Sequence, residues 1–343
     1  MAMDDLDQEA ILDPGQKIID AHHHLWSKGG WNYLYPELLA DIGTGHDIRA
    51  TVYVEGGSLT KVRGAGGTMY RADGPLAEAP LGETEFANGV AAMAASGQYG
   101  STRVAASIVA FADLRRGDAI RPVLEQHRRF TRVKGVRYIA GWIEDAASRN
   151  PAMELRPGLL LDPEFRNGMK ALEELGLSFE TTILHYQIKE LVDAARAMPG
   201  LRIAICHVGG PYGIGHYAGR PKEAFDDWLR ELRELAACPN VSLKLGGLAQ
   251  MHTGLIPPPG TATADIAALW GDHVDAAIEA FGPSRCMFES NTPVDTKHVP
   301  YKRLWNVFKT LAARYSAEER DELFHGTASR FYDVEMGESR GDA

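Results

Sequence analysis

The segment KIIDAHHHLW, residues 17–26, decides how the rest of the chain is interpreted. It begins with an apolar, β-branched run that is typical of a buried strand, and it ends in three consecutive histidines. Because side chains alternate along a strand, Asp20, His22 and His24 are predicted to share one face, with His23 on the other. Two imidazoles spaced two residues apart at the end of a strand can bind one divalent metal ion or an anionic oxygen.

Similar apolar runs recur along the whole chain and alternate with segments of helical periodicity, such as AFDDWLRELRELAAC. Eight strands that alternate with helices predict a parallel sheet closed into a single (β/α)₈ TIM barrel. A doubly wound open sheet is the competing topology, but it would carry a Gly-rich phosphate turn where this chain has histidines. The predicted strands span residues 17–26, 49–57, 103–112, 132–141, 177–184, 201–210, 240–248 and 285–293.

The barrel is predicted to occupy residues 17–335, with an N-terminal extension at 1–16 and a tail at 336–343. The first residues, MAMDDLDQEAILD, are acidic and lack the basic and apolar regions of a signal peptide.

Three connections are longer than a strand-to-helix loop requires: residues 56–84, 209–222 and 248–265. All three follow the carboxyl ends of predicted strands, which is where barrel active sites are built. We therefore expect them to contact substrate, and we expect Tyr212 of the second loop to be a substrate-binding residue.

The composition limits the kinds of molecule that this chain is expected to bind. The chain has 343 residues, of which 45% are hydrophobic, and its formal net charge is −10. This acidic balance disfavours nucleic acid and anionic membranes as partners, and no apolar run is long enough for a membrane helix. The cysteines are too far apart for a disulfide framework or a thiolate zinc site, so a cytoplasmic protein is expected. They are Cys206, Cys238 and Cys286.

Further histidines stand at the ends of other predicted strands. His207 closes IAICHVGG, and His185 lies just past the fifth apolar run. A lone histidine at a strand end is most often a structural residue. Several at the same end of one barrel would converge on its mouth, together with His22 and His24.

Charged residues also interrupt the apolar strands. A charge in such a strand is costly unless it is paired or functional. The alternative for each is an outward-facing salt bridge to a helix. The four residues are Glu55, Arg137, Lys244 and Glu289.

Asn291 presents a difficulty for the mechanism. It follows Glu289 on the same predicted face, at a position where a barrel hydrolase with a His-x-His start is expected to carry Asp. An amide can bind water or a substrate oxygen but cannot accept a proton. Glu289, Asp295 and His207 are the alternative candidates for the general base.

With these residues in place, the chain resembles the amidohydrolase superfamily. Within it, the chain is most similar to the amidohydrolase-2 group of TIM-barrel hydrolases, which includes lactonases. The matching segments follow the family order and span nearly the whole chain. They are IIDAHHHLW, KGVRYIAG, LSFETTILHYQ, HVGGP, NVSLKLGGL, RCMFESNTPVD and LFHGTASRFYDV.

The resemblance implies a cytoplasmic hydrolase that opens a lactone, or a related cyclic ester or amide, of a small carboxylated intermediate in the catabolism of aromatic or cyclic compounds. It implies one divalent metal ion, zinc first among the candidates, with metal-independent catalysis as the alternative. His22, His24 and His185 would be the metal ligands. The catalytic residues would be His207, Asn291, Glu289 and Arg137. The substrate-binding residues would be Glu55, Arg137, Lys244 and Tyr212.

Two other functions remain open at this point. One is a decarboxylase or hydratase on the same scaffold, although decarboxylases of the superfamily begin with a Glu-x-His motif that this chain lacks. The other is a non-catalytic barrel that binds a small molecule, which only Asn291 suggests. The sequence does not determine the oligomeric state, and a homo-oligomer is left open.

Overall fold

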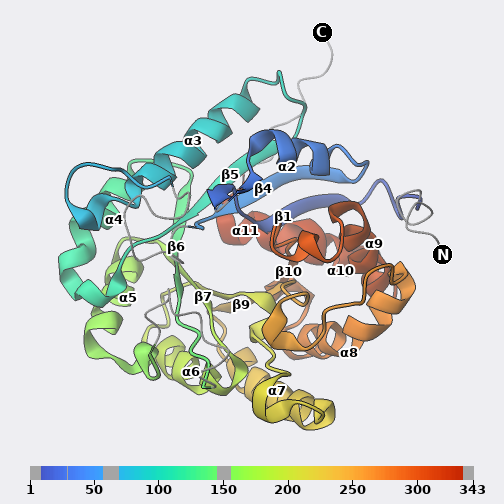
Figure 1. Cartoon of the computed structure of the whole chain (residues 1–343). Coiled ribbons are helices and arrows are strands. Elements are labelled where there is room, and N and C mark those ends of the chain that lie inside the picture. The colour runs from blue at the N-terminus through green and yellow to red at the C-terminus, as the bar shows by residue number, and fades with distance from the viewer. Residues whose placement is uncertain (1–8, 29, 57–68, 145–155, 335–343) are drawn as a thin grey trace.

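Eight parallel strands in chain order form one sheet, and the helices surround it in a ring (Figure 1). The structure, a computed structural model, describes residues 9–28, 30–56, 69–144 and 156–334. The predicted (β/α)₈ barrel is confirmed. The strands are β1 (Lys17–His23), β4 (Asp47–Val54), β5 (Arg103–Ala110), β6 (Val133–Ile139), β7 (Ser178–Thr182), β8 (Ile203–Ile205), β9 (Val241–Leu245) and β10 (Cys286–Phe288).

The barrel closes just beyond the end of β10. The His24 N–H donates to the Thr292 carbonyl at 2.8 Å, and the Asn291 N–H donates to the His22 carbonyl at 2.9 Å. A parallel bridge joins His23 to Thr292. The hydrogen bonds that close the sheet are therefore made by the histidine segment itself.

Two strands are much shorter than predicted. β8 and β10 have three residues each, against predicted spans of 201–210 and 285–293. Both predicted spans contain a residue with left-handed backbone, His207 with φ 59° and Asn291 with φ 49°. Neither residue can continue an extended strand.

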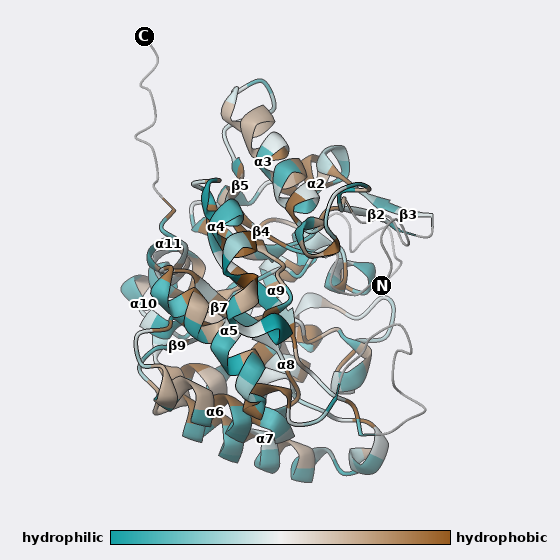
Figure 2. Cartoon of the chain, turned by 90° about the vertical axis from the view of Figure 1, so that its left-hand side faces the viewer, coloured by the Kyte–Doolittle hydropathy of each residue, from teal (hydrophilic) through white to brown (hydrophobic). Residues whose placement is uncertain are grey.

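The outer layer consists of helices whose apolar sides pack on the strands. In α5, the Asp162 side chain caps the first turn by accepting from the Glu164 and Phe165 N–H groups, and Phe165 and Met169 are buried. Hydrophilic residues mark the outward sides of α6 and α7 (Figure 2). The helices are α2 (Tyr35–Ile42), α3 (Leu81–Ala95), α4 (Arg121–Arg128), α5 (Pro163–Glu174), α6 (Ile188–Ala197), α7 (Pro221–Ala236), α8 (Thr263–Phe281), α9 (Tyr301–Ala312), α10 (Ala317–Asp321) and α11 (Thr327–Tyr332).

No helix in these described ranges is long and apolar enough to cross a membrane.

The strands separate two apolar clusters, as the alternation of side chains requires. Leu243 and Leu245 belong to the larger cluster between sheet and helices, whereas small interior side chains such as Val52 and Ala204 form the other. Tyr332 of α11 joins the interior cluster, and its carbonyl accepts from Ser107 Oγ at 2.8 Å. The last helix therefore packs against the amino-terminal end of the barrel.

The prediction that Asp20 shares a face with His22 and His24 is wrong, because β1 contains a bulge. Asp20 pairs with Thr51 and His23 pairs with Tyr53, so β1 advances three residues while β4 advances two. The Asp20 carboxylate accepts from the Ser290 N–H at 2.9 Å and from the Tyr301 hydroxyl of α9 at 3.1 Å. Asp20 thus faces the helical layer, and the bulge turns His22 into the barrel.

A buried ion pair stabilises the bulge. Lys244 of β9 donates to the carbonyl of Ala21 at 2.9 Å, and its Nζ lies 2.7 Å from Glu180 Oε2 of β7. The other oxygen of Glu180 accepts from the Tyr332 hydroxyl at 2.7 Å. Burial alone would lower the pKa of Lys244, but Glu180 raises it above its usual value, so the lysine is charged.

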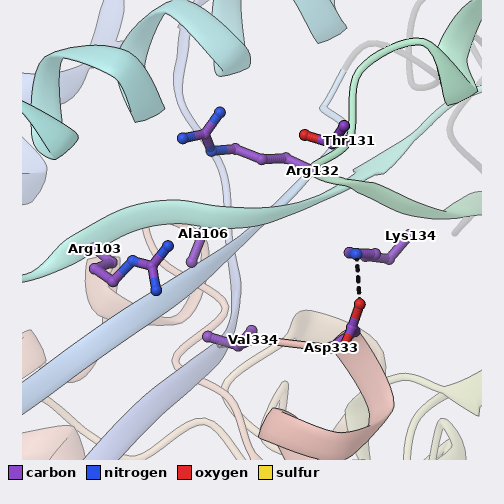
Figure 3. A pocket seen from close by; sticks show the side chains of 7 residues that line it. All are labelled: Arg103, Ala106, Thr131, Arg132, Lys134, Asp333 and Val334. Carbon is purple, nitrogen blue, oxygen red and sulfur yellow. Dashed lines mark hydrogen bonds and ion pairs between the residues drawn. The ribbon is translucent and has the colours of Figure 1, made fainter. Parts of the chain in front are cut away.

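A pocket of about 250 Å³ lies at the amino-terminal end of the barrel (Figure 3). It is opposite the end at which barrel enzymes place their chemistry. Lys134 and Asp333 form an ion pair of 2.8 Å within it. The lining residues are Arg103, Ala106, Thr131, Arg132, Lys134, Asp333 and Val334.

Replacing Lys244 by methionine is expected to lower the free energy of unfolding by about 3–5 kcal/mol, because Glu180 would remain buried without its counter-charge. Urea denaturation measures this loss. The double variant K244M/E180Q should recover part of it, because it removes both charges. The matched control is Lys222→Met in the exposed Lys222–Asp226 pair, with an expected change below about 0.5 kcal/mol. Equal small losses for both lysines would contradict a structural role of the buried pair.

Candidate active site at the barrel mouth

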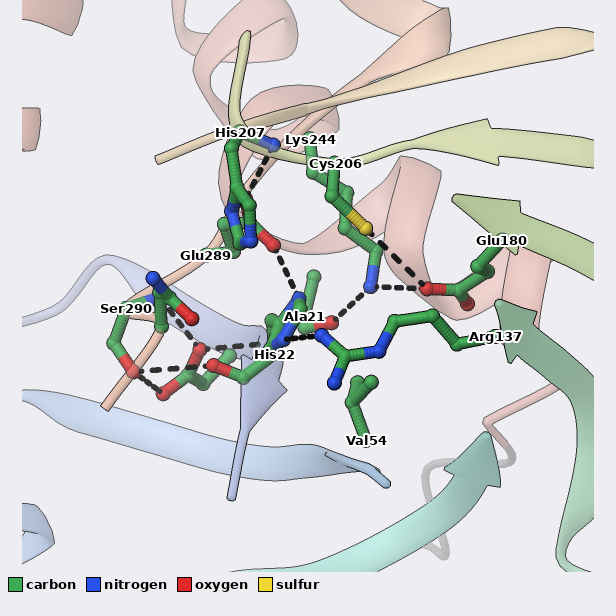
Figure 4. A network of polar contacts seen from close by, with 12 residues as sticks. Ala21, His22, Val54, Arg137, Glu180, Cys206, His207, Lys244, Glu289 and Ser290 are labelled. Atoms are coloured by element: carbon green, nitrogen blue, oxygen red, sulfur yellow. Dashed lines mark hydrogen bonds and ion pairs between the residues drawn. The ribbon is translucent and has the colours of Figure 1, made fainter. Parts of the chain in front are cut away.

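The Glu289 carboxylate lies between two imidazoles at the carboxyl end of the strands (Figure 4). Its Oε2 is 2.7 Å from Nδ1 of His22, and its Oε1 is 2.7 Å from Nδ1 of His207. The His207 backbone N–H also donates to Oε1 at 2.9 Å. One carboxylate thus fixes the orientation of both rings.

The protonation states follow from these contacts. Burial alone would raise the pKa of Glu289, but His207 and His22 lower it well below its usual value, so Glu289 is ionised. Burial lowers the pKa of His22 well below its usual value, despite Glu289. An anionic oxygen 2.7 Å away favours a proton on the ring nitrogen that faces it, so the neutral His22 ring carries its proton on Nδ1 and leaves Nε2 as a lone pair.

His24 reaches the same state through a different partner. Its Nδ1 lies 2.7 Å from the carbonyl oxygen of Val54, which can only accept. Burial lowers its pKa well below the usual value, and the positive charge of Arg137 lowers it further. The Nε2 atoms of His22 and His24 are 3.2 Å apart, so two lone pairs face each other.

Arg137 supplies a positive charge at this point. Its Nη1 is 3.3 Å from His22 Nε2, and its Nε donates to Glu55 Oε1 at 2.8 Å. Arg137 and Glu55 are both buried, with 2% and 0% exposure. The ion pair fixes the guanidinium while one of its edges points at the histidines.

Two glycines leave room for this arrangement. A Cβ atom on Gly247 would lie 2.3 Å from His207 Cβ, and one on Gly246 would lie 2.5 Å from Glu289 Cγ. Both distances are far below van der Waals contact. The glycine pair that follows β9 is therefore required by the side chains of His207, after β8, and Glu289, after β10.

The arrangement fits a divalent cation. Two nitrogen ligands on one tetrahedral zinc ion, each about 2.0–2.1 Å from it, lie about 3.3 Å apart, close to the separation of the two Nε2 atoms. Glu289 and the Val54 carbonyl hold the opposite ring nitrogens, as partners of metal-bound histidines usually do.

Cys206 also lies near this group. Ligand atoms of His22, Cys206 and His207 lie within 4.8 Å of one another. Burial raises the pKa of the Cys206 thiol to about 12. The thiol is therefore protonated, which leaves the imidazoles as the better donors.

His185 and Tyr212 form a separate aromatic cluster. His185 Nδ1 accepts from the Tyr212 N–H at 3.1 Å, and its Nε2 is 3.3 Å from the Tyr217 hydroxyl. Both ring nitrogens are therefore occupied, and neither offers a lone pair to a metal in this arrangement. The Tyr212 ring packs against Leu184 and Tyr217 and is only 1% exposed.

The four charged strand residues all lie inside the protein rather than in outward salt bridges. Glu289, Arg137 and Glu55 lie around the two histidines. Lys244 lies next to them but is bound to Glu180 and the Ala21 carbonyl. Glu180 is not among the predicted site residues, although the apolar run LSFETTIL carries the same signal, a charge within a strand.

Asn291 and Asp295 lie side by side. Asn291 Nδ2 donates to Asp295 Oδ1 at 2.9 Å, and both residues are 1% exposed. Much of the first long loop, residues 57–68, lies outside the described residues, so its predicted substrate contacts remain a prediction.

The barrel and the histidine group at its mouth have the architecture of a TIM-barrel hydrolase. The amidohydrolase family model matches residues 19–334. The chain belongs to this family and is a hydrolase, as the resemblance implied.

Relatives and solved structures agree with this assignment. The chain is 31% identical over 256 residues to an uncharacterised protein of Sinorhizobium fredii, covering 74% of this chain and 76% of the relative. It is 28% identical over 324 residues to L-fucono-1,5-lactonase of Burkholderia multivorans, covering 93% of this chain and 96% of that enzyme. A zinc-bound amidohydrolase of Burkholderia multivorans shares the fold with a TM-score of 0.69 and 24% identity, over 93% of this chain and 99% of that one.

Replacing Glu289 by glutamine is expected to destabilise the protein at pH 7, because one imidazole N–H would then face an amide NH₂ group. The loss of a charge-assisted hydrogen bond costs about 1.5–3 kcal/mol in urea denaturation. The pKa of Glu289 is lowered by folding, so its stabilisation is present above the unfolded value of 4.5 and is lost as pH falls through the folded pKa. The difference between wild type and E289Q should therefore shrink in acid. Glu85→Gln, in an exposed pair with Arg71, is the control and should change stability little at either pH.

Proposed function

We propose that this protein hydrolyses the lactone ring of a small carboxylated substrate at the barrel mouth. The observation that carries this proposal is the facing pair of Nε2 lone pairs on His22 and His24, with the Arg137 guanidinium beside them. L-fucono-1,5-lactonases of two Burkholderia species are among the relatives, which supports a lactone as the substrate class.

His22 and His24 would hold one divalent cation, with zinc first among the candidates because the Burkholderia multivorans amidohydrolase binds it. When bound, such an ion polarises a carbonyl and lowers the pKa of water. The roles of the protein's own side chains can be derived from their contacts.

His207 is the proton carrier of the proposed mechanism. Its Nδ1 is held by Glu289, so the neutral ring keeps a lone pair on Nε2. This nitrogen accepts a proton from the attacking water and later returns it to the ring oxygen of the lactone as the C–O bond breaks. Glu289 is a positioning residue, because both of its oxygens already contact imidazoles.

Arg137 stabilises the negative charge that develops on the carbonyl oxygen. Glu55 holds the guanidinium in place, so little reorganisation is needed when the charge forms. The charges of Arg137 and Lys28 both act on His24 and lower the pKa of this histidine. Two cations at this edge favour a substrate that carries a carboxylate.

A panel of five- and six-membered lactones, with and without a carboxylate, tests the activity by titration of the acid released. We expect wild type to open a carboxylated lactone and His207→Ala to lose about 10²–10⁴-fold in kcat. His325→Ala, at the opposite end of the barrel, is the matched control and should keep activity. Full activity of His207→Ala would contradict the assigned role. Carbon dioxide release from aromatic acids, without ring opening, would favour a decarboxylase.

Metal content tests the role of the histidine pair. Protein purified without chelators should contain roughly one zinc ion per chain, and His22→Ala and His24→Ala should lose it. Treatment with a chelator should abolish ring opening, and added zinc should restore it. Full activity of a metal-free enzyme would instead show that Arg137 and the histidines act without a metal.

A further inference from the structure

Asp295 is a buried carboxylate beside the proposed site that the mechanism above does not use. It begins a short 3₁₀ turn, Asp295–Lys297, after the end of β10. Its backbone N–H donates to the Asn291 carbonyl at 3.2 Å, which places residue 295 one turn beyond residue 291. Asn291 in turn donates its backbone N–H to the His22 carbonyl at 2.9 Å. This short connection ties Asp295 to the histidine segment.

The side chains of the pair have a defined orientation. An ionised carboxylate only accepts hydrogen bonds, so the Asn291 amide must turn its Nδ2 toward Asp295, as the 2.9 Å contact shows. Its Oδ1 is then directed away from Asp295. An amide that donates to a carboxylate also carries more negative charge on its oxygen, because hydrogen bonds in series polarise one another.

We propose that Asp295 is a positioning residue for the hydrolysis, which orients and polarises the Asn291 amide so that its oxygen binds the attacking water or a substrate hydroxyl. This inference rests on the proposed function. It gives Asn291, which cannot take a proton itself, a defined part in the site. It also accounts for a carboxylate kept inside the protein against the cost of desolvation.

The surroundings of Asp295 fit this role. Burial and, to a smaller extent, Glu289 raise its pKa, whereas His207 and the Asn291 hydrogen bond lower it, and together these effects place the pKa at about 7. The remaining polar neighbour is the Ala249 N–H, at 3.5 Å from Oδ2. Near neutral pH the carboxylate therefore exists in both forms, and only the ionised form fixes the amide in the orientation described.

The first test compares the kinetics of Asp295→Asn, Asn291→Asp and the exchanged double variant N291D/D295N on the lactone that wild type opens. D295N should lower kcat about 10–100-fold with little change in KM, because residues behind a site usually have effects of this size. The acidic limb of its pH profile should also shift. The double variant keeps a hydrogen bond between the two positions and returns a carboxylate to the mouth, so it should recover most of kcat.

Unchanged kcat and pH profile in D295N, or a double variant no better than D295N, would overturn the proposal. Glu190→Gln is the matched control, because Glu190 is also a carboxyl group with a pKa raised by burial but lies on α6, in the outer helical layer. It should leave kcat and the pH profile unchanged.

A second test uses thermal unfolding and does not depend on activity. Folding raises the pKa of Asp295 above its unfolded value, so its favourable contribution is present below pH 3.8 and is lost as pH rises through about 7. D295N removes this penalty and should melt at or above the wild-type temperature at pH 8, with a smaller advantage at pH 5 and none below pH 3.8. A purely structural carboxylate would give a lower melting temperature at pH 8, and that result would overturn the proposal.

The two tests separate the possible failures. If wild type opens no lactone, the proposed function fails, but a D295N variant stabilised at pH 8 would still show that Asp295 is retained at a cost in stability, as residues of functional sites often are. If wild type opens a lactone and D295N behaves like wild type in both tests, only the role of Asp295 fails.

Discussion

The clamp that Glu289 forms on two imidazoles is the interaction on which the rest of the site depends. A single ionised side chain fixes His22 on β1 and His207 after β8, so that the tautomer and direction of both rings are set together. A buried carboxylate is tolerable only with such partners. Without the Glu289 carboxylate, the rings of His22 and His207 would be free to exchange tautomers. Their Nε2 lone pairs would then no longer be fixed at the barrel mouth.

The remaining charges of the interior obey the same constraint. Two cations of the barrel strands are each in contact with an anion, Arg137 with Glu55 and Lys244 with Glu180. The Lys244 pair is used for architecture, since it binds the carbonyl that the β1 bulge turns inward. The Arg137 pair leaves one guanidinium edge for chemistry. Lys244 and Arg137 thus differ in role because the protein itself accepts hydrogen bonds from different numbers of their N–H donors.

Much of the fold could be predicted from the sequence, because alternating apolar strands and amphipathic helices report burial directly. The residues at the strand ends were also predictable, since histidines and charges are costly there. The bulge in β1 was not, because it depends on the pairing with β4 and on Lys244, which is more than 200 residues away. For the same reason Asp20 was assigned to the wrong face.

The contacts of His185 and Asn291 could not be predicted from the pattern of their own strands. His185 remains a predicted metal ligand, but in this structure its ring nitrogens contact the Tyr212 N–H and the Tyr217 hydroxyl of a later loop. The amide of Asn291 was recognised as unable to act as a base. Its contact with Asp295 was not predicted, because it forms where the backbone of Asn291 is left-handed, and the sequence pattern does not reveal this conformation. Local patterns identify which residues are unusual, and tertiary contacts determine what they do.

The hydrogen bond from Tyr332 to Glu180 has a consequence for the order of folding. It links α11, through Lys244, to the carbonyl of Ala21 on β1. Contacts between residues so far apart in the chain cost more loop-closure entropy than local contacts. The support of the bulge is therefore completed only when segments from both halves of the barrel have come together.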